Sequence, residues 1–222
     1  MSLEAVLKIG GSLSRGNGLE DLCREICRLG EIHRIVIVPG GGAFADQVRD
    51  TYTRFRLDET TAHHMALLAM DQYGCLLHYL MPGSVLTADL ACARHEAESG
   101  KPAILLPTAA VLQDDSLPHS WQVTSDTISA WIARMSDCRR LIILKDVDGL
   151  MAVQDIRSGP VGLILELTIE QLAKHRGGVD EYLSHFLAAE PLETWVINGR
   201  HPGRLVELLE RSYTTGTRIL RK

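Results

Sequence analysis

The sequence has no excess of basic residues, since 23 Lys and Arg side chains face 28 Asp and Glu, for a formal net charge of −5. Nucleic-acid binding draws on a concentrated basic surface, so this balance argues against a nucleic-acid partner. No apolar run approaches the ~20 residues of a membrane span, and we expect no membrane association. The first residues lack a basic stretch followed by an apolar segment, so we expect no signal peptide and a cytoplasmic protein.

Cysteines are few, and their odd number follows no regular spacing: Cys23, Cys27, Cys75, Cys92 and Cys138. This pattern favours reduced thiols over a disulfide framework. Cys23 and Cys27 lie four residues apart on an expected helix, but nearby His33 alone does not complete a metal site. We interpret both cysteines as small packing residues and expect no metal ligands in the chain.

Hydrophobic residues make up 45% of the chain and charged residues 23%, a composition that supports a full core and argues against disorder. The length of 222 residues is close to the usual ~100–200 residues per domain. We therefore expect a single domain over residues 1–222.

Short apolar runs alternate with helical patterns along the chain. The expected strands cover residues 5–9, 34–38, 85–86, 103–106, 140–144, 194–197 and 217–220. The main expected helices cover residues 19–29, 43–79 with a break near 57–58, a segment ending at 98, 124–135 and 202–210. Strands separated by helices form βαβ units, so the pattern predicts an α/β fold with a mainly parallel sheet.

Two local signals lie outside this alternation. Thr168 and Gln171 have the spacing of a capping box, in which each side chain bonds the backbone N–H of the other residue. Residues 149–166 break the strand–helix rhythm and are typical of a hairpin that projects from the sheet.

Ligands of open α/β sheets bind at the carboxyl ends of the strands, and a glycine pair follows the first strand there. Lys8 is near the end of that strand, and Gly10, Gly11 and Ser12 come after it. Glycine allows backbone amides to approach a phosphate closely, and lysine adds a positive charge. The alternative interpretation is a simple turn with a surface lysine. The order differs from the GxxxxGK[ST] phosphate loop because the lysine precedes the glycines.

Three consecutive glycines follow the next strand: Gly40, Gly41 and Gly42. Such a segment is entropically costly, and it opens onto a helix N-terminus, which favours anions. It does not match the GxGxxG dinucleotide fingerprint, so a nicotinamide enzyme is disfavoured. A tight turn remains the alternative. The repetition of the glycine theme on two strands favours phosphate or substrate binding.

Charged residues end the apolar strand 140–144. They are Lys145, Asp146 and Asp148, followed by Gly149. Asp-Gly is an ordinary turn signal, whereas a lysine at this position is less common. Asp126 lies in the first turn of the expected helix 124–135, for which Thr124 or Ser125 is the expected cap. Asp126 could interact with the helix dipole alone, or it could orient lysines by charged hydrogen bonds.

Four further polar residues leave alternatives open. His63 and His64 could contact an acceptor or a metal, or form a partly exposed helix face. Asp71 and Asp180 are candidate acids for a substrate amine, although Asp180 could simply cap the helix after it.

The motifs occur in a defined order: residues 8–12, 40–42, 126, 145–149, 167–172 and 216–220. This order resembles the amino acid kinase family, which includes acetylglutamate, uridylate and isopentenyl phosphate kinases. The resemblance covers nearly the whole chain. It implies the carbamate kinase-like fold, a three-layer αβα sandwich, and an ATP-dependent kinase whose Mg²⁺ is held mainly by ATP phosphates and water.

Other stretches resemble one group within that family: residues 64–74, 123–126, 178–180 and 196–199. This group comprises the [5-(aminomethyl)furan-3-yl]methyl phosphate kinases of methanofuran biosynthesis. The resemblance implies a small phosphomonoester acceptor that becomes a diphosphate, and a homo-oligomer.

The resemblance also implies residue roles. Lys8 would contact the transferred phosphoryl group, Asp126 would order the lysines, and Lys145 would be a second cation. Phosphate or acceptor would be held by Gly10, Gly11, Ser12, Gly40, Gly41 and Gly42. The nucleotide would be bordered by Asp146, Asp148 and Gly149. These roles suit phosphoryl transfer, which depends mostly on positioning and charge neutralisation.

The sequence departs from the family at two places. Residues 150–154 replace a Tyr-Thr-x-Asp-Pro-like stretch that contacts adenine in many relatives. Some relatives also place the second lysine beyond the hairpin, where this chain has only Lys174. A kinase of this fold with a carboxylate, nucleotide or isoprenoid phosphate acceptor is one alternative. A non-catalytic nucleotide- or oxyanion-binding protein is another.

Overall fold

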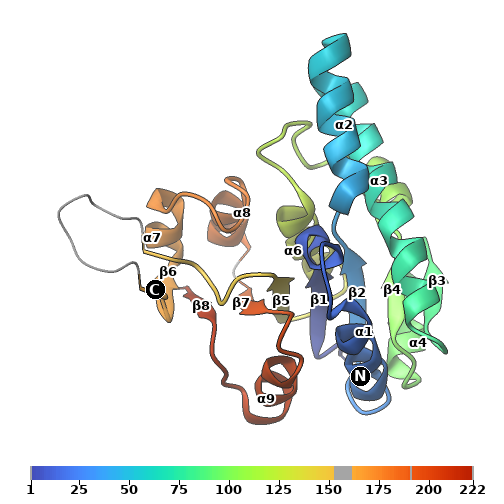
Figure 1. The fold of residues 1–222 in the computed structure, drawn as a ribbon, viewed down its shortest axis with the longest axis vertical. Coiled ribbons are helices and arrows are strands. Elements are labelled where there is room, and N and C mark those ends of the chain that lie inside the picture. The colour runs from blue at the N-terminus through green and yellow to red at the C-terminus, as the bar shows by residue number, and fades with distance from the viewer. Residues whose placement is uncertain (1, 153–161, 191, 222) are drawn as a thin grey trace.

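A computed structural model describes residues 2–152, 162–190 and 192–221, which share one eight-stranded sheet (Figure 1). The strand order is β3-β4-β2-β1-β5-β7-β8-β6. The strands are β1 (Ala5–Ile9), β2 (Ile35–Pro39), β3 (Val85–Thr87), β4 (Ala103–Leu105), β5 (Arg140–Lys145), β6 (Glu166–Thr168), β7 (Glu193–Asn198) and β8 (Thr217–Leu220). Neighbouring strands are parallel except β7 and β8. The predicted mainly parallel sheet is confirmed.

Strand β1 occupies the middle of the sheet and pairs with β2 on one side and β5 on the other. The chain therefore winds outward from β1 in both directions. In open α/β sheets the crevice at such a reversal is where ligands bind. The carboxyl ends of β1, β2 and β5 meet there.

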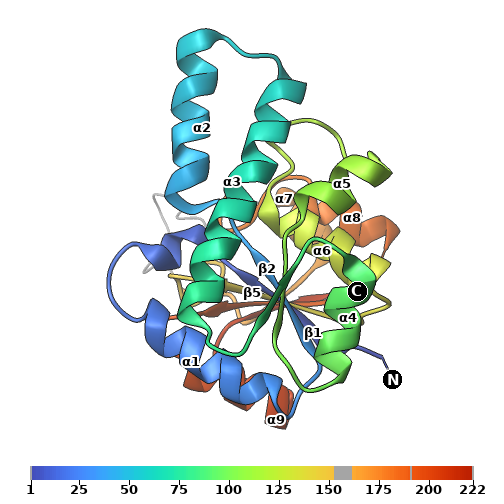
Figure 2. The same cartoon turned by 90° about the vertical axis from the view of Figure 1, so that its right-hand side faces the viewer.

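Helices cover both faces of the sheet, which makes the predicted three-layer αβα sandwich. They are α1 (Leu19–Gly30), α2 (Gly42–Phe55), α3 (Glu59–Leu80), α4 (Leu90–Glu98), α5 (Thr108–Asp114), α6 (Ser125–Met135), α7 (Ile169–Lys174), α8 (Leu183–Ala189) and α9 (Gly203–Arg211). Figure 2 shows α1 and α9 on one side of the sheet and α4 and α6 on the other. None of the helices in the described ranges combines the length and hydropathy needed to cross a bilayer.

Alternation along the strands decides which layer each side chain joins. In β1, Leu7 packs in the core beneath α1 and α9, whereas Val6 packs in the core beneath α6. Successive side chains of a strand point to opposite faces, so Lys8 lies on the same face as Val6. Burial of each fully buried aliphatic side chain on either face stabilises the folded state by roughly 1.5–3 kcal/mol.

Helices α2 and α3 form an antiparallel hairpin that rises beyond the sheet (Figures 1 and 2). The predicted break near 57–58 is confirmed. Arg56 adopts a left-handed backbone conformation with φ of 51°, which ends α2. The Asp58 carboxylate then accepts a hydrogen bond from the backbone N–H of Thr61 (2.8 Å) and caps α3.

The capping box at Thr168 and Gln171 is also confirmed, because both of its reciprocal hydrogen bonds are present. The base of the expected hairpin is antiparallel. The N–H of Ala152 donates to the Gly162 carbonyl (2.9 Å), and Met151 pairs with Leu163. Residues 153–161, which include the expected tip, lie outside the described residues. Glu166 begins β6 rather than ending the hairpin.

The sequence-based assignment lacks two short elements, α5 and β6, and gives no bounds for a third, α8, the helix expected after Asp180. They contain seven, three and seven residues. Segments this short show less than two turns or repeats of any hydrophobic period. Their structure depends on packing against neighbours, so the local pattern does not reveal them.

Candidate active site

A buried carboxylate lies between two lysines at the carboxyl ends of β1 and β5. Lys8 Nζ is 2.7 Å from Asp126 Oδ1, an ion pair, and Lys145 Nζ donates a hydrogen bond to Asp126 Oδ2 at 2.8 Å. The Lys8 and Asp126 side chains are only 5% and 3% exposed, and Lys145 is 19% exposed. The structure thus brings together the three residues predicted to be catalytic.

Strand register explains this convergence. Lys8 pairs with Ile143 across the β1–β5 ladder, and Lys145 follows Ile143 by two residues. Both lysines therefore point to the face that packs on α6. Asp126 is in the first turn of α6, where backbone N–H groups favour a negative charge. The alternation of side chains along β1 and β5 and the start of α6 thus bring Lys8, Lys145 and Asp126 into contact.

Burial and charge pairing have opposite effects on the pKa values of Asp126 and Lys8. Burial alone would raise the pKa of Asp126, but Lys145 and Lys8 outweigh burial and hold its pKa well below the usual range. Burial lowers the pKa of Lys8, Asp126 opposes that change, and Lys145 adds to it. The charge of Lys8 consequently depends on Asp126. Removal of the carboxylate would leave two neighbouring cations uncompensated.

The N-terminus of α6 is capped by a residue far along the chain. Thr124 occupies the predicted cap position, but its side chain makes no capping bond. The Asp180 carboxylate instead accepts hydrogen bonds from the N–H groups of Thr124 and Thr127, both at 2.9 Å. It accepts further bonds from both threonine hydroxyls and from the Leu183 N–H. Asp180 is therefore part of the support of Asp126 and is not free to bind an amine.

The two glycine loops pack directly against each other. A Cβ atom on Gly11 would lie 2.2 Å from Gly42 Cα, and one on Gly40 would lie 2.9 Å from the Gly11 nitrogen. Gly42 also has a positive φ of 56°. The glycines are thus required for the close approach of β1 and β2 loops, a structural role in addition to any ligand contact.

Backbone hydrogen bonds separate these glycines into two groups. The Gly10 N–H donates to the Leu144 carbonyl and the Gly40 N–H to the Ile9 carbonyl, both at 2.8 Å. Their N–H groups are therefore already paired. Gly11, Gly41 and Gly42 lie where a helical segment begins, and such N–H groups have no acceptor within the helix. These three glycines are the better candidates for phosphate contact.

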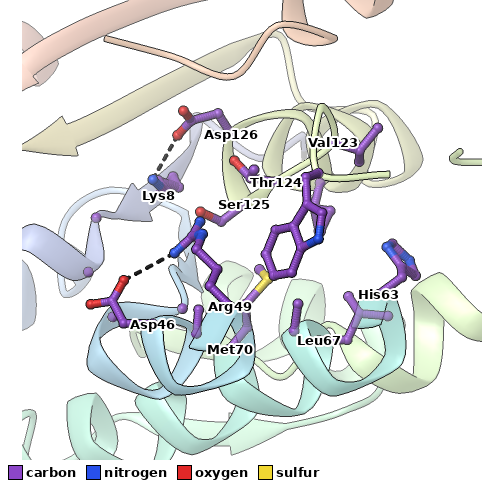
Figure 3. A pocket seen from close by; sticks show the side chains of 18 of the residues that line it. Lys8, Asp46, Arg49, His63, Leu67, Met70, Val123, Thr124, Ser125 and Asp126 are labelled. Carbon is purple, nitrogen blue, oxygen red and sulfur yellow. Dashed lines mark hydrogen bonds and ion pairs between the residues drawn. The ribbon is translucent and has the colours of Figure 1, made fainter. Parts of the chain in front are cut away.

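A cavity of about 270 Å³ opens next to the paired lysines (Figure 3). Lys8, Gly11, Ser12 and Lys145 are at one end of its lining. Its walls come from α2, α3 and residues 120–128, the last of which includes the start of α6. A cavity of this size, with lysine side chains in its lining, suits a small anionic ligand.

Two arginines that the sequence analysis did not single out line the same cavity. Arg15 contacts the Asp46 carboxylate, and Arg49 donates to the other oxygen of Asp46 at 3.1 Å. Arg49 Cζ also lies 5.1 Å from the centre of the Trp121 ring. No motif marks these residues, because 31 positions separate Arg15 from Asp46. The cavity thus has four cationic side chains near the glycine loops.

The predicted nucleotide-bordering residues lie outside this cavity. The Asp148 carboxylate accepts hydrogen bonds from Asn198 (3.0 Å) and Arg204 (2.7 Å), and these partners lower its pKa. Asp146 is exposed, and Gly149 packs against Thr217, whose Oγ1 would be 2.5 Å from an added Cβ. The segment that follows Lys145 therefore joins the ends of β5, β7 and β8.

The remaining candidates divide between the cavity and other parts of the fold. His63 is buried and lines the cavity, whereas His64 is exposed. Asp71 lies outside the cavity lining, and the Thr108 N–H is 3.4 Å from its carboxylate. Burial raises the pKa of the Cys23 thiol to about 12, which makes it unreactive. The described residues form no group of three or more His, Cys, Asp or Glu side chains able to hold a metal.

Comparison with solved structures defines the class of fold. The uridylate kinase of Archaeoglobus fulgidus superposes with a TM-score of 0.78 at 18% identity, covering 98% of this chain and 100% of that one. The UMP kinase of Bacillus anthracis gives 0.77 at 17% identity, covering 100% and 98%. The sandwich and its central β1 are therefore those of the UMP kinase fold.

Sequence comparison identifies the family. The model of the amino acid kinase family matches residues 4–189. The [5-(aminomethyl)furan-3-yl]methyl phosphate kinase of Methanocaldococcus jannaschii is 33% identical over 221 residues, 97% of each chain. The acetylglutamate kinase of Salinispora tropica is 35% identical over 92 residues, 41% of this chain and 29% of that protein. The chain belongs to the amino acid kinase family and is a kinase, as its motif order predicts.

Proposed function

We propose that the protein transfers a phosphoryl group from ATP to [5-(aminomethyl)furan-3-yl]methyl phosphate and forms the diphosphate, a step of methanofuran-type cofactor biosynthesis. The observation that carries this proposal is the 33% identity to the kinase named for that acceptor, over 97% of both chains. The cavity supports it, because it is small and has cations at one end. We further propose that residues 1–222 act as one cytoplasmic kinase domain.

The lysines would supply the charge stabilisation. An oxygen of the acceptor phosphate attacks the γ-phosphorus of ATP, the bond to the β-phosphate oxygen breaks, and ADP leaves. Negative charge then accumulates on the equatorial oxygens of the transferred group. Lys8 and Lys145 would face these oxygens while Asp126 holds their ammonium groups 2.7 and 2.8 Å from its own oxygens. A phosphate nucleophile is already ionised at neutral pH, so the step needs no general base.

The acceptor phosphate would lie at the glycine loops. Gly11, Gly41 and Gly42 leave backbone N–H groups at the starts of helical segments, next to Ser12. Arg15 and Arg49 line the same end of the cavity and add positive charge. Asp146, Asp148 and Gly149 would border the nucleotide on the other side of Lys145, as the family resemblance implies.

Magnesium would enter with ATP, held mainly by the ATP phosphates and water, and would neutralise part of their charge. Both oxygens of Asp126 are already occupied by lysine ammonium groups, and the Asp180 N–H adds a bond at 3.2 Å. Asp126 is therefore better suited to orient the lysines than to bind a metal ion.

A coupled assay of ADP release tests the function directly. Purified protein with ATP and Mg²⁺ is expected to turn over [5-(aminomethyl)furan-3-yl]methyl phosphate with a higher kcat/KM than UMP, isopentenyl phosphate or N-acetylglutamate. Mass spectrometry should show a product heavier by one phosphoryl group. Preference for another acceptor would reject the acceptor assignment. Thermal stabilisation by ATP without turnover of any acceptor would indicate a non-catalytic nucleotide-binding protein.

We also propose that the protein self-associates through α3. Leu68, Leu76 and Tyr79 on this helix are 52%, 38% and 81% exposed. Neighbouring exposed apolar side chains on a helix favour contact with another protein surface. Light scattering at micromolar concentration should give a mass above 24.5 kDa, and Leu76→Glu together with Tyr79→Glu should return it to the monomer. A monomeric wild type would contradict the proposal.

A further inference from the structure

One face of the N-terminal half of α3 forms a wall of the cavity. Its contributors are Glu59, Ala62, His63, Ala66, Leu67 and Met70. Their spacing of three and four residues places them on one side of a helix. With a rise of 1.5 Å per residue, Glu59 and Met70 are about 16 Å apart along the axis. The cavity therefore has two ends that different chemical groups of one ligand could occupy.

The end near Met70 is the phosphate end. Tyr73, one helical turn further on, has its hydroxyl 3.5 Å from the Gly10 carbonyl. The Tyr73 ring also lies beside Gly42, where an added Cβ atom would be 3.8 Å from Tyr73 Cδ2. Figure 3 shows Met70 between Lys8 and His63, with His63 on the side away from the lysine. The opposite part of the cavity, formed by Glu59 and His63, is termed the distal end.

Carboxylates line the cavity at three positions, and two of them are neutralised. Asp126 pairs with the two lysines, and Asp46 pairs with Arg15 and Arg49. Glu59 differs because no cationic partner exists for it among the described residues. It accepts a hydrogen bond from the Tyr52 hydroxyl at 2.9 Å. The distal end thus presents the one lining carboxylate of the described chain that no cation offsets.

The other polar group of the distal end is an uncharged imidazole. His63 is 7% exposed, and its ring stacks on His119 with 4.5 Å between ring centres. Burial, together with His119 and His64, lowers the pKa of His63 to about 4. At neutral pH the ring adds no positive charge, and an unprotonated ring nitrogen can accept a hydrogen bond. A cationic group entering here meets a carboxylate and a neutral acceptor.

From these observations we infer that the distal end recognises the ammonium group of the acceptor, with Glu59 as the residue that determines specificity for it. This inference rests on the proposed function, because it assigns the second charged group of the same acceptor. The phosphate of such a molecule faces Lys8, Arg15 and Arg49, and its ammonium faces Glu59 and His63. Opposite charges at the two ends of the cavity then set the orientation of a zwitterionic substrate.

The test compares two acceptors that differ only in the amine: [5-(aminomethyl)furan-3-yl]methyl phosphate and its analogue with a methyl group in place of the aminomethyl group. The quantity of interest is the ratio of their kcat/KM values. Wild type is expected to prefer the amine. Glu59→Gln removes the charge but keeps the size of the side chain, and the ratio should fall by about 10-fold, the value of a charged hydrogen bond at a partly exposed site.

Glu20→Gln is the matched control. Glu20 is also an exposed acid in the first turn of a helix, α1, but it does not line the cavity. It reproduces the loss of charge and of the helix-dipole interaction, and its ratio should equal that of wild type. A melting curve of both variants establishes that each remains folded.

The outcomes separate the two proposals. If wild type uses both acceptors equally and Glu59→Gln leaves the ratio unchanged, the ammonium site is wrong while the kinase function stands. If Glu59→Gln lowers kcat/KM equally for both acceptors, Glu59 is a structural residue and the inference is also wrong. If ATP binds but neither phosphomonoester is phosphorylated, the proposed acceptor is wrong and the inference falls with it.

Discussion

The backbone N–H of Asp180 donates a hydrogen bond to Oδ2 of Asp126 at 3.2 Å. The Asp180 carboxylate meanwhile accepts hydrogen bonds from Thr124 and Thr127, which begin the helix that carries Asp126. The loop before α8 is thereby joined to the lysine-paired carboxylate. Asp180 touches neither lysine, so its effect on the reaction would be one of positioning.

We expect Asp180→Ala to lower the free energy of unfolding by about 2–4 kcal/mol, because five donors at a partly buried site lose their acceptor. Its kcat should also fall about 10-fold at a temperature where the variant is folded, since Asp126 loses its support. Urea unfolding and steady-state kinetics measure the two effects. Asp180→Asn keeps the shape of the side chain and one acceptor oxygen, so its unfolding free energy and its kcat should both fall less than those of Asp180→Ala.

Asp89→Ala is the control for Asp180. Asp89 caps α4 through the local Cys92 N–H at 2.6 Å and does not line the cavity. Asp89→Ala should lower the free energy of unfolding by about 1 kcal/mol, the usual effect of losing a local cap, and should leave kcat unchanged. If Asp180→Ala behaved like Asp89→Ala in both measurements, Asp180 would be an ordinary cap.

Lys8→Ala is expected to lower kcat by at least ~10², because in the proposed mechanism this cation faces the charge that develops in the transition state. Lys145→Ala should lower kcat by a similar order. Lys174→Ala is the matched control, since this lysine is exposed on α7 and contacts none of the site residues. Steady-state kinetics with saturating ATP would make the comparison. A loss in Lys174→Ala without one in Lys145→Ala would assign the second cation to Lys174.

Gly11→Ala tests the contact between the glycine loops. The added methyl group would lie 2.2 Å from Gly42 Cα, so the two loops must separate. We expect a loss of about 2–3 kcal/mol in unfolding free energy and a higher KM for the acceptor. Gly203→Ala adds the same group into open space at the start of α9. Its unfolding free energy should be unchanged or slightly raised; equal effects of both changes would show that loop packing is unimportant.

His63 should make stability depend on pH in a defined window. Its pKa is lowered from 6.5 to about 4 in the folded protein, mainly by burial. Between those values the unfolded chain binds more protons than the folded one, so unfolding free energy falls as the pH falls. Between pH 7 and pH 5 the contribution of this group is about 1–2 kcal/mol.

Urea unfolding at pH 7 and pH 5 would test the His63 prediction. His63→Gln should reduce the difference between the two pH values by that amount, because glutamine does not titrate. His64→Gln is the control, since the neighbouring histidine is exposed, and it should preserve the wild-type difference. If the two variants responded to pH alike, His63 would titrate normally in the folded protein.

Local patterns accounted for much of the fold and for the centre of the site. Continuous apolar runs identify buried strands because both faces of a covered sheet exclude water. The sequence predicts the break between α2 and α3 but does not identify Asp58 as the cap of α3. The break is visible in the sequence because a left-handed residue followed by a capping acid interrupts helical periodicity. Lys8 and Lys145 stand at strand ends in the sequence itself, and the parallel order brings those ends together.

Contacts between distant segments were not accessible in the same way. Asp180 caps a helix whose N-cap residue, Thr124, lies 56 residues earlier, and its sequence context shows only a helix start after two glycines. Asp71 and Asp180 were the acids considered for a substrate amine, yet the cavity contains Glu59 instead. Side-chain direction and pairing decide this choice, and neither follows from residue type.

The residues at strand ends and helix starts, and therefore the kind of chemistry, were determined by the sequence through spacing and periodicity, which act within a few residues. The partners of each charge were decided only by the tertiary structure. Asp46 is neutralised by arginines and Glu59 is not, although both are acidic residues on neighbouring helices. Such pairing depends on distances between segments far apart in the chain, because electrostatic interactions in a cavity act through space.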